Sequence, residues 1–152
     1  MKTFIYLITC LLVSQCGETF YMIRILNNSE HKVSFFSAFP HSYLHAYPDT
    51  TLHKENDVFV SFGDILPSTG TSTGGSRSWE SKFEEIPSDT LSFYFFHSDT
   101  LAKYTWEEVR TDYMVLKRYD LSIEDIQMLD YEITYPPTEV MKDIQMYPPY
   151  NK

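Results

Sequence analysis

Short runs of strand-forming residues recur along this chain of 152 residues and are separated by residues that favour turns. The chain contains 11 Phe and 12 Tyr, and aromatic side chains fit the pleated surface of a sheet. No long helical segments of the kind that connects parallel strands lie between the runs. The pattern predicts a mainly β, antiparallel, sandwich-like single domain with about six strands. The expected strands are residues 20–26, 32–39, 58–62, 90–96, 113–119 and 130–135.

Three short helices are expected between these strands, because capping residues precede short apolar stripes. Thr105 and Glu108 have the spacing of a capping box, in which each side chain bonds the other residue's backbone N–H. Ser78 and Ser122 are suitable N-caps for two further helices. The expected helices cover residues 79–86, 105–112 and 122–129.

Two connections are also predicted. The Asn- and Ser-rich residues 27–30 favour a hairpin between the first two strands. Residues 68–76 read S-T-G-T-S-T-G-G-S, a low-complexity composition typical of a flexible loop.

The first sixteen residues have the composition of an export signal. Lys2 is the single charge, and residues 4–13 form an apolar stretch of ten, shorter than the roughly 20 residues that span a bilayer. The run ends in V-S-Q-C, which is similar to the lipobox of bacterial lipoproteins, although Gln15 departs from the small residue preferred before the cysteine. We therefore expect a signal peptide at 1–15 and a lipidated Cys16 with a short tether at 16–19. Ordinary secretion with cleavage further along is the alternative.

Composition narrows the classes of partner. The net charge of −9 argues against nucleic acid and anionic lipid surfaces, because both require clustered basic residues. The two cysteines are Cys10, inside the signal, and Cys16, so the mature chain is expected to contain neither a disulfide nor a zinc–thiolate site.

Histidines supply the one metal-site candidate. His41 and His45 have i,i+4 spacing, His53 follows, and Asp49 offers a carboxylate for Zn²⁺ or Cu²⁺. Two flanking prolines oppose a helix there, so we interpret these as loop histidines and expect no metal and no cofactor. The one G-x-S-x-G match, at residues 70–74, lies in the low-complexity run, where no strand-to-helix elbow is expected around its serine, and no H-E-x-x-H motif is present. No catalytic residue is therefore expected, and a metal-dependent hydrolase remains the weaker alternative.

Tyrosines near loops and ends are the candidate binding residues: Tyr43, Tyr47, Tyr147 and Tyr150. An exposed tyrosine gives a rigid, amphipathic contact surface for a protein or a sugar ring. The last two of these lie in residues 138–152, which repeat an earlier D-I-Q-M and Y-P-P and are expected to be a flexible Pro/Tyr tail after a β-rich domain at 20–137. A polyproline-like peptide offered to a partner is the alternative interpretation of this tail.

The basic residues Lys117 and Arg118 lie beside Asp120, with Arg110 nearby, in an otherwise acidic chain. We interpret this grouping as ion pairs at the rim of a strand and a helix.

Several motifs between residues 87 and 137 resemble one family: S-D-T-L-S-F at 88–93, H-S-D-T-L at 97–101, K-Y-T-W-E-E-V-R at 103–110, L-K-R-Y-D-L-S at 116–122 and I-T-Y-P-P at 133–137. The family is the uncharacterised small lipoproteins of Bacteroides-type gut bacteria. The resemblance implies an envelope lipoprotein and supports Cys16 as the lipidated residue. It implies no activity and transfers no catalytic residue.

Together these observations predict an envelope lipoprotein, lipid-anchored to the inner or outer membrane, with the periplasmic face slightly favoured over the cell surface. The expected role is non-enzymatic binding of an envelope protein or a glycan. A structural component of an envelope assembly is the alternative.

Overall fold

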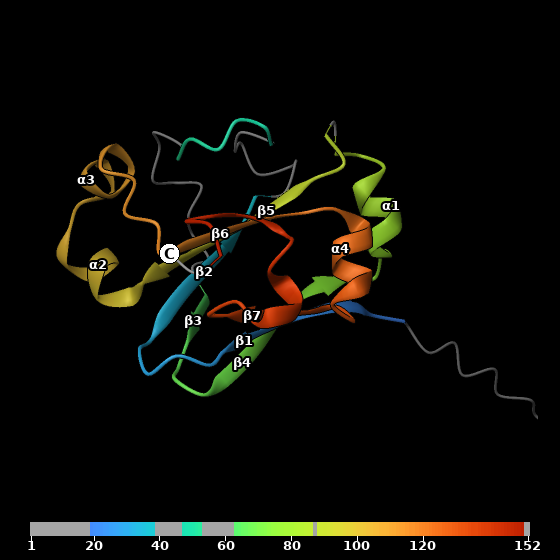
Figure 1. Cartoon of the computed structure of the whole chain (residues 1–152), viewed down its shortest axis with the longest axis horizontal. Coiled ribbons are helices and arrows are strands. Elements are labelled where there is room, and N and C mark those ends of the chain that lie inside the picture. Colours follow the sequence, from blue (N-terminus) through green and yellow to red (C-terminus); the bar gives the residue numbers. More distant parts are fainter. Residues whose placement is uncertain (1–18, 39–46, 53–62, 87, 151–152) are drawn as a thin grey trace, which may run out of the picture.

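In the computed structural model, which describes residues 19–38, 47–52, 63–86 and 88–150, the chain is mainly β and forms two sheets (Figure 1). The three-stranded sheet has the order β4-β1-β7, formed by Thr69–Gly75, Tyr21–Asn27 and Glu132–Tyr135. The five-stranded sheet has the order β3-β2-β5-β6-β8, formed by Gly63–Ile65, Val33–Ser37, Leu91–His97, Lys117–Leu121 and Gln145–Tyr147.

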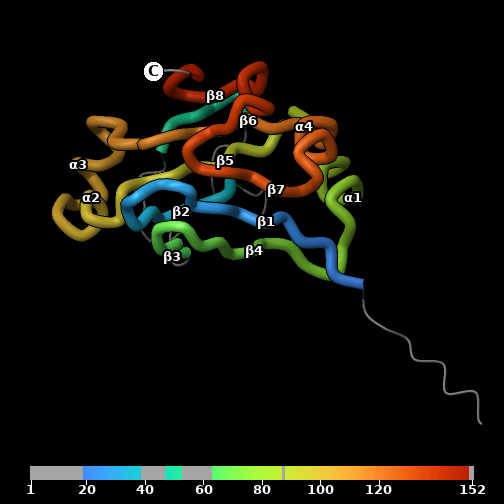
Figure 2. Tube along the Cα trace, turned by 60° about the horizontal axis from the view of Figure 1, so that its bottom comes forward, coloured from blue at the N-terminus to red at the C-terminus, as the bar shows by residue number. Residues whose placement is uncertain are grey.

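Short helices connect these strands. They are α1 (Trp79–Phe83), α2 (Ser98–Lys103), α3 (Trp106–Thr111), α4 (Ile123–Met128) and a 3-10 turn, η2 (Glu139–Met141). Figures 1 and 2 show α2 and α3 together at one end of the molecule and α1 and α4 at the other. Among the described residues, no helix has both the length and the apolar character needed to cross a membrane.

The five-stranded sheet is covered on both faces. The main core lies between the two sheets and includes Phe93 and Phe95 of β5 with Ile23 and Ile25 of β1. On the other face, Tyr94 and Phe96 of β5 pack under residues of α2, α3 and the segment 47–52. Because side chains alternate along a strand, burial of six consecutive β5 residues requires a layer on each side.

The mainly β, sandwich-like architecture predicted from the sequence is therefore confirmed. The run at 90–96 forms the central strand β5, and the runs near 113–119 and 130–135 form β6 and β7. The three capped helices are also present, with Ser78, Thr105 and Ser122 at their N-caps. The expected strand at 58–62 lies outside the described residues.

The predicted hairpin between the first two strands is wrong. β1 pairs only with β4 and β7 among the described strands, whereas β2 pairs with β3 and β5 in the other sheet. Asn27, which was assigned to the turn, is the last residue of β1 and is fully buried. Its side-chain amide donates to the carbonyl oxygens of His31 at 2.7 Å and of Ile65 in β3 at 3.0 Å, so it links the two sheets. The pairing also departs from a purely antiparallel pattern, because β1 and β7 run parallel.

The predicted flexible loop at 68–76 is instead mostly the edge strand β4, which pairs with β1 over seven residues. Its glycines allow the close approach of the two backbones. A Cβ added to Gly70 would lie 2.6 Å from Cδ2 of Leu26 and 3.0 Å from the carbonyl oxygen of Ile25. The Gly-, Ser- and Thr-rich composition of β4 resembles that of a linker, but it suits a strand beside β1, which leaves little room for larger side chains.

The expected flexible tail at 138–152 is ordered over residues 138–150. Its strand β8 pairs antiparallel with β6, and Met141, Ile144 and Met146 are buried in the main core. The buried ammonium of Lys117 donates to the carbonyl oxygen of Pro148 at 2.7 Å, which fixes the end of the segment. Burial lowers the pKa of Lys117.

We predict that Met141→Ala lowers the free energy of unfolding by about 2–5 kcal/mol, because Met141 is 1% exposed and the substitution leaves a cavity in the core. The neighbouring Val140 is 61% exposed, so Val140→Ala is a matched control with an expected change below about 0.5 kcal/mol. Urea denaturation measures both. Equal, small effects at the two positions would contradict the packing of this segment into the core.

Candidate functional site

A surface pocket of about 630 Å³ opens on the face of the five-stranded sheet that carries α3. The pocket lies between the end of α3, the strands β6 and β8, and the segment 47–52. Its lining consists of Thr50, Thr51, Leu52, Arg110, Thr111, Tyr113, Arg118 and Tyr147.

Strand register brings the central side chains together. Arg118 of β6 lies opposite Tyr147 of β8 on one side and opposite Tyr94 of β5 on the other. Asp120 lies two residues along β6 from Arg118, so both side chains project from the same face of the sheet. The floor of the pocket therefore forms because alternate side chains of β6 point to the same face of the sheet.

Arg118 and Asp120 form an ion pair at the base of the pocket. The Nε atom of Arg118 lies 3.0 Å from Oδ1 and 3.1 Å from Oδ2 of Asp120. The Asp120 side chain is completely buried, and the hydroxyl of Ser92 donates to its Oδ1 at 2.6 Å. Burial acts to lower the pKa of Arg118, but the hydrogen bond and the charge of Asp120 outweigh this and raise that pKa.

Tyr113 forms one wall of the pocket and has a strained backbone. Its φ of 49° lies in the left-handed region, directly after the C-cap of α3. The N–H of Met114 donates to the carbonyl of Val109, and that of Tyr113 to the carbonyl of Arg110, which is the Schellman motif, usually completed by glycine. A tyrosine there costs about 1–2 kcal/mol in backbone strain. Tyr113 therefore occupies a position at which the end of α3, considered by itself, favours glycine.

The Tyr113 hydroxyl is held at both of its hydrogen-bonding sites. It donates to the carbonyl oxygen of Thr50 at 3.2 Å and accepts a hydrogen bond from Nη1 of Arg118. Tyr94 also donates to the Thr50 carbonyl, at 3.5 Å. Burial raises the pKa of Tyr113, so the phenol stays protonated at neutral pH. These bonds attach the segment containing Thr50 to the sheet.

Tyr147 is the most exposed aromatic group of the pocket. Its ring meets that of Tyr113 edge to face, with centroids 5.3 Å apart, and the guanidinium carbon of Arg118 lies 5.8 Å from the ring centroid. The residue is nevertheless 44% exposed. Part of a rigid aromatic surface thus faces solvent beside polar groups that are already oriented.

The two charged residues that line the pocket are each paired with a carboxylate. Arg110 makes two hydrogen bonds to Glu107, of 2.7 Å from Nε and 2.6 Å from Nη2, and Arg118 is paired with Asp120. Among the described residues, Nη2 of Arg118 makes no hydrogen bond and remains available as a donor. The site is therefore polar, aromatic and close to neutral.

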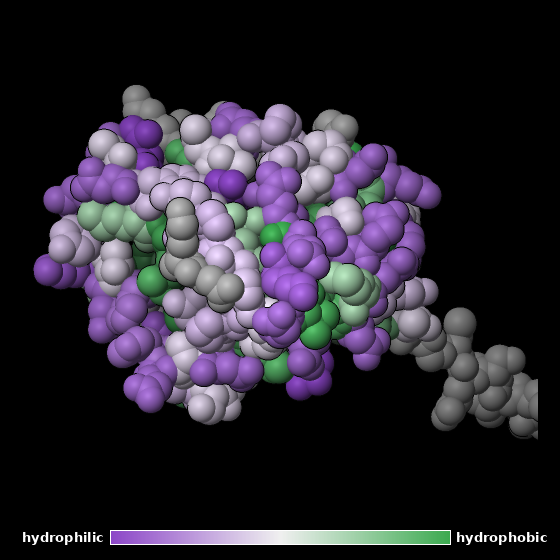
Figure 3. Space-filling model, in the orientation of Figure 1, coloured by the Kyte–Doolittle hydropathy of each residue, from purple (hydrophilic) through white to green (hydrophobic). Residues whose placement is uncertain are grey.

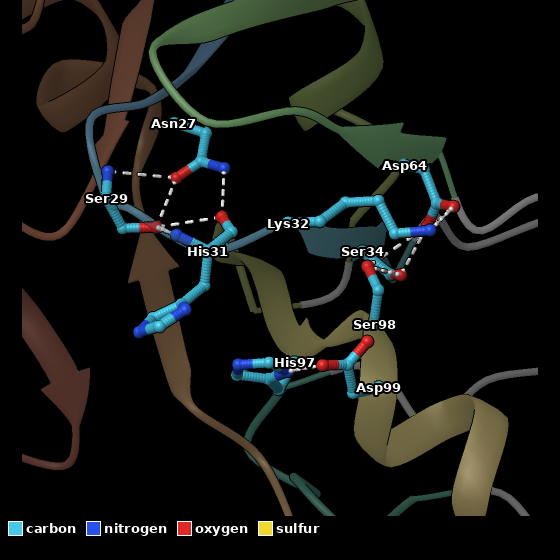
Figure 4. A network of polar contacts seen from close by, with 9 residues as sticks. All are labelled: Asn27, Ser29, His31, Lys32, Ser34, Asp64, His97, Ser98 and Asp99. Carbon is cyan, nitrogen blue, oxygen red and sulfur yellow. Dashed lines mark hydrogen bonds and ion pairs between the residues drawn. The ribbon is translucent and has the colours of Figure 1, made fainter.

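A second polar cluster lies on the same sheet near β3, and Figure 4 shows its members. The carboxylate of Asp64 accepts from Ser34 at 2.6 Å, from Ser98 at 3.2 Å and from Lys32 at 2.8 Å. The hydrogen bond from Lys32 and then that from Ser34 lower the pKa of Asp64. These bonds connect β2, β3 and the start of α2, and Ser34 and Ser98 are both buried. We interpret the cluster as a structural link between elements.

Two histidines border that cluster. The rings of His31 and His97 have centroids 5.1 Å apart, and Nδ1 of His97 lies 3.9 Å from Asp99. Within the part of the chain that the structure describes, no group of three or more His, Cys, Asp or Glu side chains is arranged to hold a metal ion.

The residues singled out from the sequence fall in different places. Tyr147 lies in the pocket, whereas Tyr47 accepts from Gln145 at 2.9 Å and Tyr150 donates to Glu139 at 3.2 Å, both outside its lining. The remaining candidates, which are Cys16, His41, Tyr43, His45 and His53, lie outside the described residues.

Sequence reasoning missed the roles of Arg118, Asp120 and Tyr113, although it noted the first two as an ion-paired group. The expected strand at 113–119 placed Tyr113 in β6, whereas β6 begins at Lys117. The alternation of Arg118 and Asp120 was the available signal, because residues two apart in a strand share a face.

Comparison with known proteins gives no relative: no family model, curated protein or solved structure matches this chain.

We predict that Asp120→Ala lowers the free energy of unfolding by about 3–5 kcal/mol, because it leaves the guanidinium of Arg118 without its buried partner. The double variant Asp120→Ala, Arg118→Met removes both charges and is expected to recover most of this loss. Asp143, which is exposed, provides the control Asp143→Ala, with no measurable change. Chemical denaturation of the four proteins measures the effect, and a loss in the double variant as large as in Asp120→Ala would contradict the pairing argument.

Proposed function

We propose that this chain is an envelope-anchored lipoprotein that binds a neutral saccharide in the pocket beside Tyr147, without catalysing a reaction. The observation that carries the proposal is the half-exposed Tyr147 ring beside the oriented Arg118–Asp120 pair. An aromatic face packs against the C–H groups of a sugar ring, while planar polar side chains bond its hydroxyls. The lipobox-like V-S-Q-C sequence supports the anchor at Cys16.

The charge balance favours a neutral ligand over an anionic one. Both arginines of the lining already have carboxylate partners, so an anionic ligand would compete with Glu107 and Asp120 for the same guanidinium groups. Within the part of the chain that the structure describes, Nη2 of Arg118 has no hydrogen-bond partner, so it can donate to a ligand hydroxyl without disturbing the ion pair. The overall charge of −9 adds unfavourable long-range repulsion for an anion.

The same bonding supports binding rather than hydrolysis. Glycoside hydrolysis requires two carboxyl groups that flank the scissile bond. The described lining of the pocket contains no carboxylate. Asp120, buried under Arg118, and Glu107, paired with Arg110, are each engaged by an arginine of that lining.

A structural role in an envelope assembly is the second candidate, and the edge strand β4 favours it. β4 contains only Gly, Ser and Thr, without the charges or prolines that usually protect an edge from pairing with another chain. In that case no saccharide would change the melting temperature, and cross-linking in the envelope would trap one stoichiometric protein partner.

We predict that a neutral oligosaccharide raises the melting temperature of the full-length Cys16→Ser protein, and that Tyr147→Ala in the same background weakens its binding at least about tenfold. Screening includes neutral glucans, xylans and mannans beside the acidic polygalacturonate, and calorimetric titration measures the affinity of any hit. Tyr104→Ala is the matched control, because Tyr104 is exposed and lies outside the pocket.

The salt dependence distinguishes the two ligand classes. Binding of a neutral saccharide is expected to change little between low and moderate ionic strength, because no ion pair with the ligand is screened. Preference for polygalacturonate, or full binding by Tyr147→Ala, would contradict the proposed site.

We predict that Cys16→Ser moves the protein from the membrane fraction to the soluble fraction, because each buried acyl CH₂ contributes about 0.8 kcal/mol to membrane binding. Cys10→Ser is the matched control and is expected to leave the protein in the membrane fraction, since residue 10 belongs to the expected signal peptide. Fractionation and the mass of the N-terminal peptide measure the outcome. Membrane association that persists unchanged in Cys16→Ser would overturn the anchor.

A further inference from the structure

Three consecutive apolar residues are exposed where β1 begins: Phe20, directly before the strand, and Tyr21 and Met22, its first two residues. We call them the β1 patch. Their exposed fractions are 61%, 39% and 41%. The next core-facing residues of the same strand, Ile23 and Ile25, are completely buried. The strand therefore changes within a few residues from apolar and exposed to apolar and buried.

Neighbouring strands leave the β1 patch uncovered. Tyr21 and Met22 lie opposite Gly75 and Gly74 of β4, which have no side chains. Gly74 has a φ of 155°, and a Cβ at this position would overlap the carbonyl oxygen of Tyr21, so a side chain is excluded there. On the other side, the pairing with β7 begins only at Arg24.

The outer face of β1 changes from apolar to charged along its length. Met22 and Arg24 share that face, because side chains alternate along a strand, and the exposed Phe20 directly precedes the strand. The Arg24 side chain is 64% exposed and lies 2.9 Å from Glu132. Apolar and aromatic groups followed by a charged group match the order of environments from the acyl boundary to the aqueous side of a bilayer interface.

Chain length places the β1 patch beside the expected anchor. Three residues lie between Cys16 and Phe20, so the two Cα atoms are four steps apart and at most about 14 Å from each other in an extended chain. Figures 1 and 2 show the start of β1 at the periphery of the molecule, on the side of α1 and away from α2 and α3. Figure 3 shows that hydrophilic residues cover most of the face in view and that hydrophobic residues surface there only in small areas.

We infer that the β1 patch inserts into the headgroup region of a zwitterionic lipid surface, which carries no net charge. This contact orients the domain so that the Tyr147 pocket faces away from the membrane. This inference rests on the proposed lipid anchor at Cys16. The net charge of −9 makes an anionic lipid surface unfavourable, so the contact is expected to be apolar and insensitive to salt.

The test uses the lipidated full-length protein in phosphatidylcholine vesicles. With Cys16 acylated and residue 10 removed, Met22→Cys gives one free thiol in the β1 patch for an environment-sensitive fluorophore. Leu66→Cys is the matched control, because Leu66 is 58% exposed and lies near Thr69, which pairs with the opposite end of β1. The two labels are separated by about 20 Å along the sheet.

Doxyl-labelled phosphatidylcholine in the vesicles is expected to remove at least about half of the emission at position 22 and to leave that at position 66 unchanged, because an interfacial group lies about 5–10 Å into the boundary. Phe20→Cys is a second labelled variant and is expected to behave like Met22→Cys. Melting temperatures equal to that of the unlabelled protein confirm that each variant is folded.

Flotation of the same vesicles tests the lipid anchor at Cys16 separately from the orientation of the domain. If all variants float but positions 20 and 22 are quenched no more than position 66, the orientation is wrong and the anchor stands. If the proteins do not float, or if Cys16 itself reacts with the fluorophore, the anchor is wrong and the orientation falls with it.

Discussion

Burial of both faces of β5 is the constraint on which the rest of this structure depends. A strand whose side chains point alternately into two hydrophobic layers requires cover on each side, and two separate parts of the chain provide it. The three-stranded sheet with α1 and α4 covers Phe93 and Phe95. The helices α2 and α3, with the segment 47–52, cover Tyr94 and Phe96.

The described part of the second layer changes from apolar to polar across the sheet, and the pocket lies on its polar side. Apolar cover over Phe96 gives way to the polar residues Arg118 and Asp120 toward the β6–β8 side. Charged groups so deeply placed are retained only when paired, and each of them is paired with the other. Tyr113 closes the boundary between the two regions, and its bond to Thr50 offsets part of the strain in its left-handed backbone. Among the described residues, the pocket therefore lies where the apolar packing under α3 meets the paired charges of β6.

Local signals predicted the parts of the fold that local interactions determine. The capping boxes at Thr105 and Ser122 use residues three apart, so their hydrogen bonds are visible in the sequence itself. The apolar composition of β5 similarly predicted a central strand. Such features depend on no distant segment.

Local signals in the sequence did not predict which strands pair with one another. Asn27 resembles a turn residue, yet its amide bonds Ile65, which is 38 residues away, and so ends a strand at the joint between two sheets. Tyr147 was a candidate on composition alone, and only the pairing of β8 with β6 places it beside Arg118. The site residues come from three regions of the chain, and their proximity depends on a register that the sequence alone did not specify.

The pocket and the start of β1 present different surface chemistry, and the residues at each place account for the difference. The end with α3 presents Tyr147 beside paired charges, which favours a hydrated ligand. The end where β1 begins presents Phe20 and Met22 beside glycines that cannot cover them, which favours a surface free of water. With the proposed lipid anchor at Cys16, four residues before Phe20, the domain would gain from placing the second end on lipid, since the alternative exposes either the apolar patch to water or the polar pocket to the membrane. The proposed tether and the glycines of β4 would then act in the same direction, toward one orientation in which each end meets the environment that solvates it.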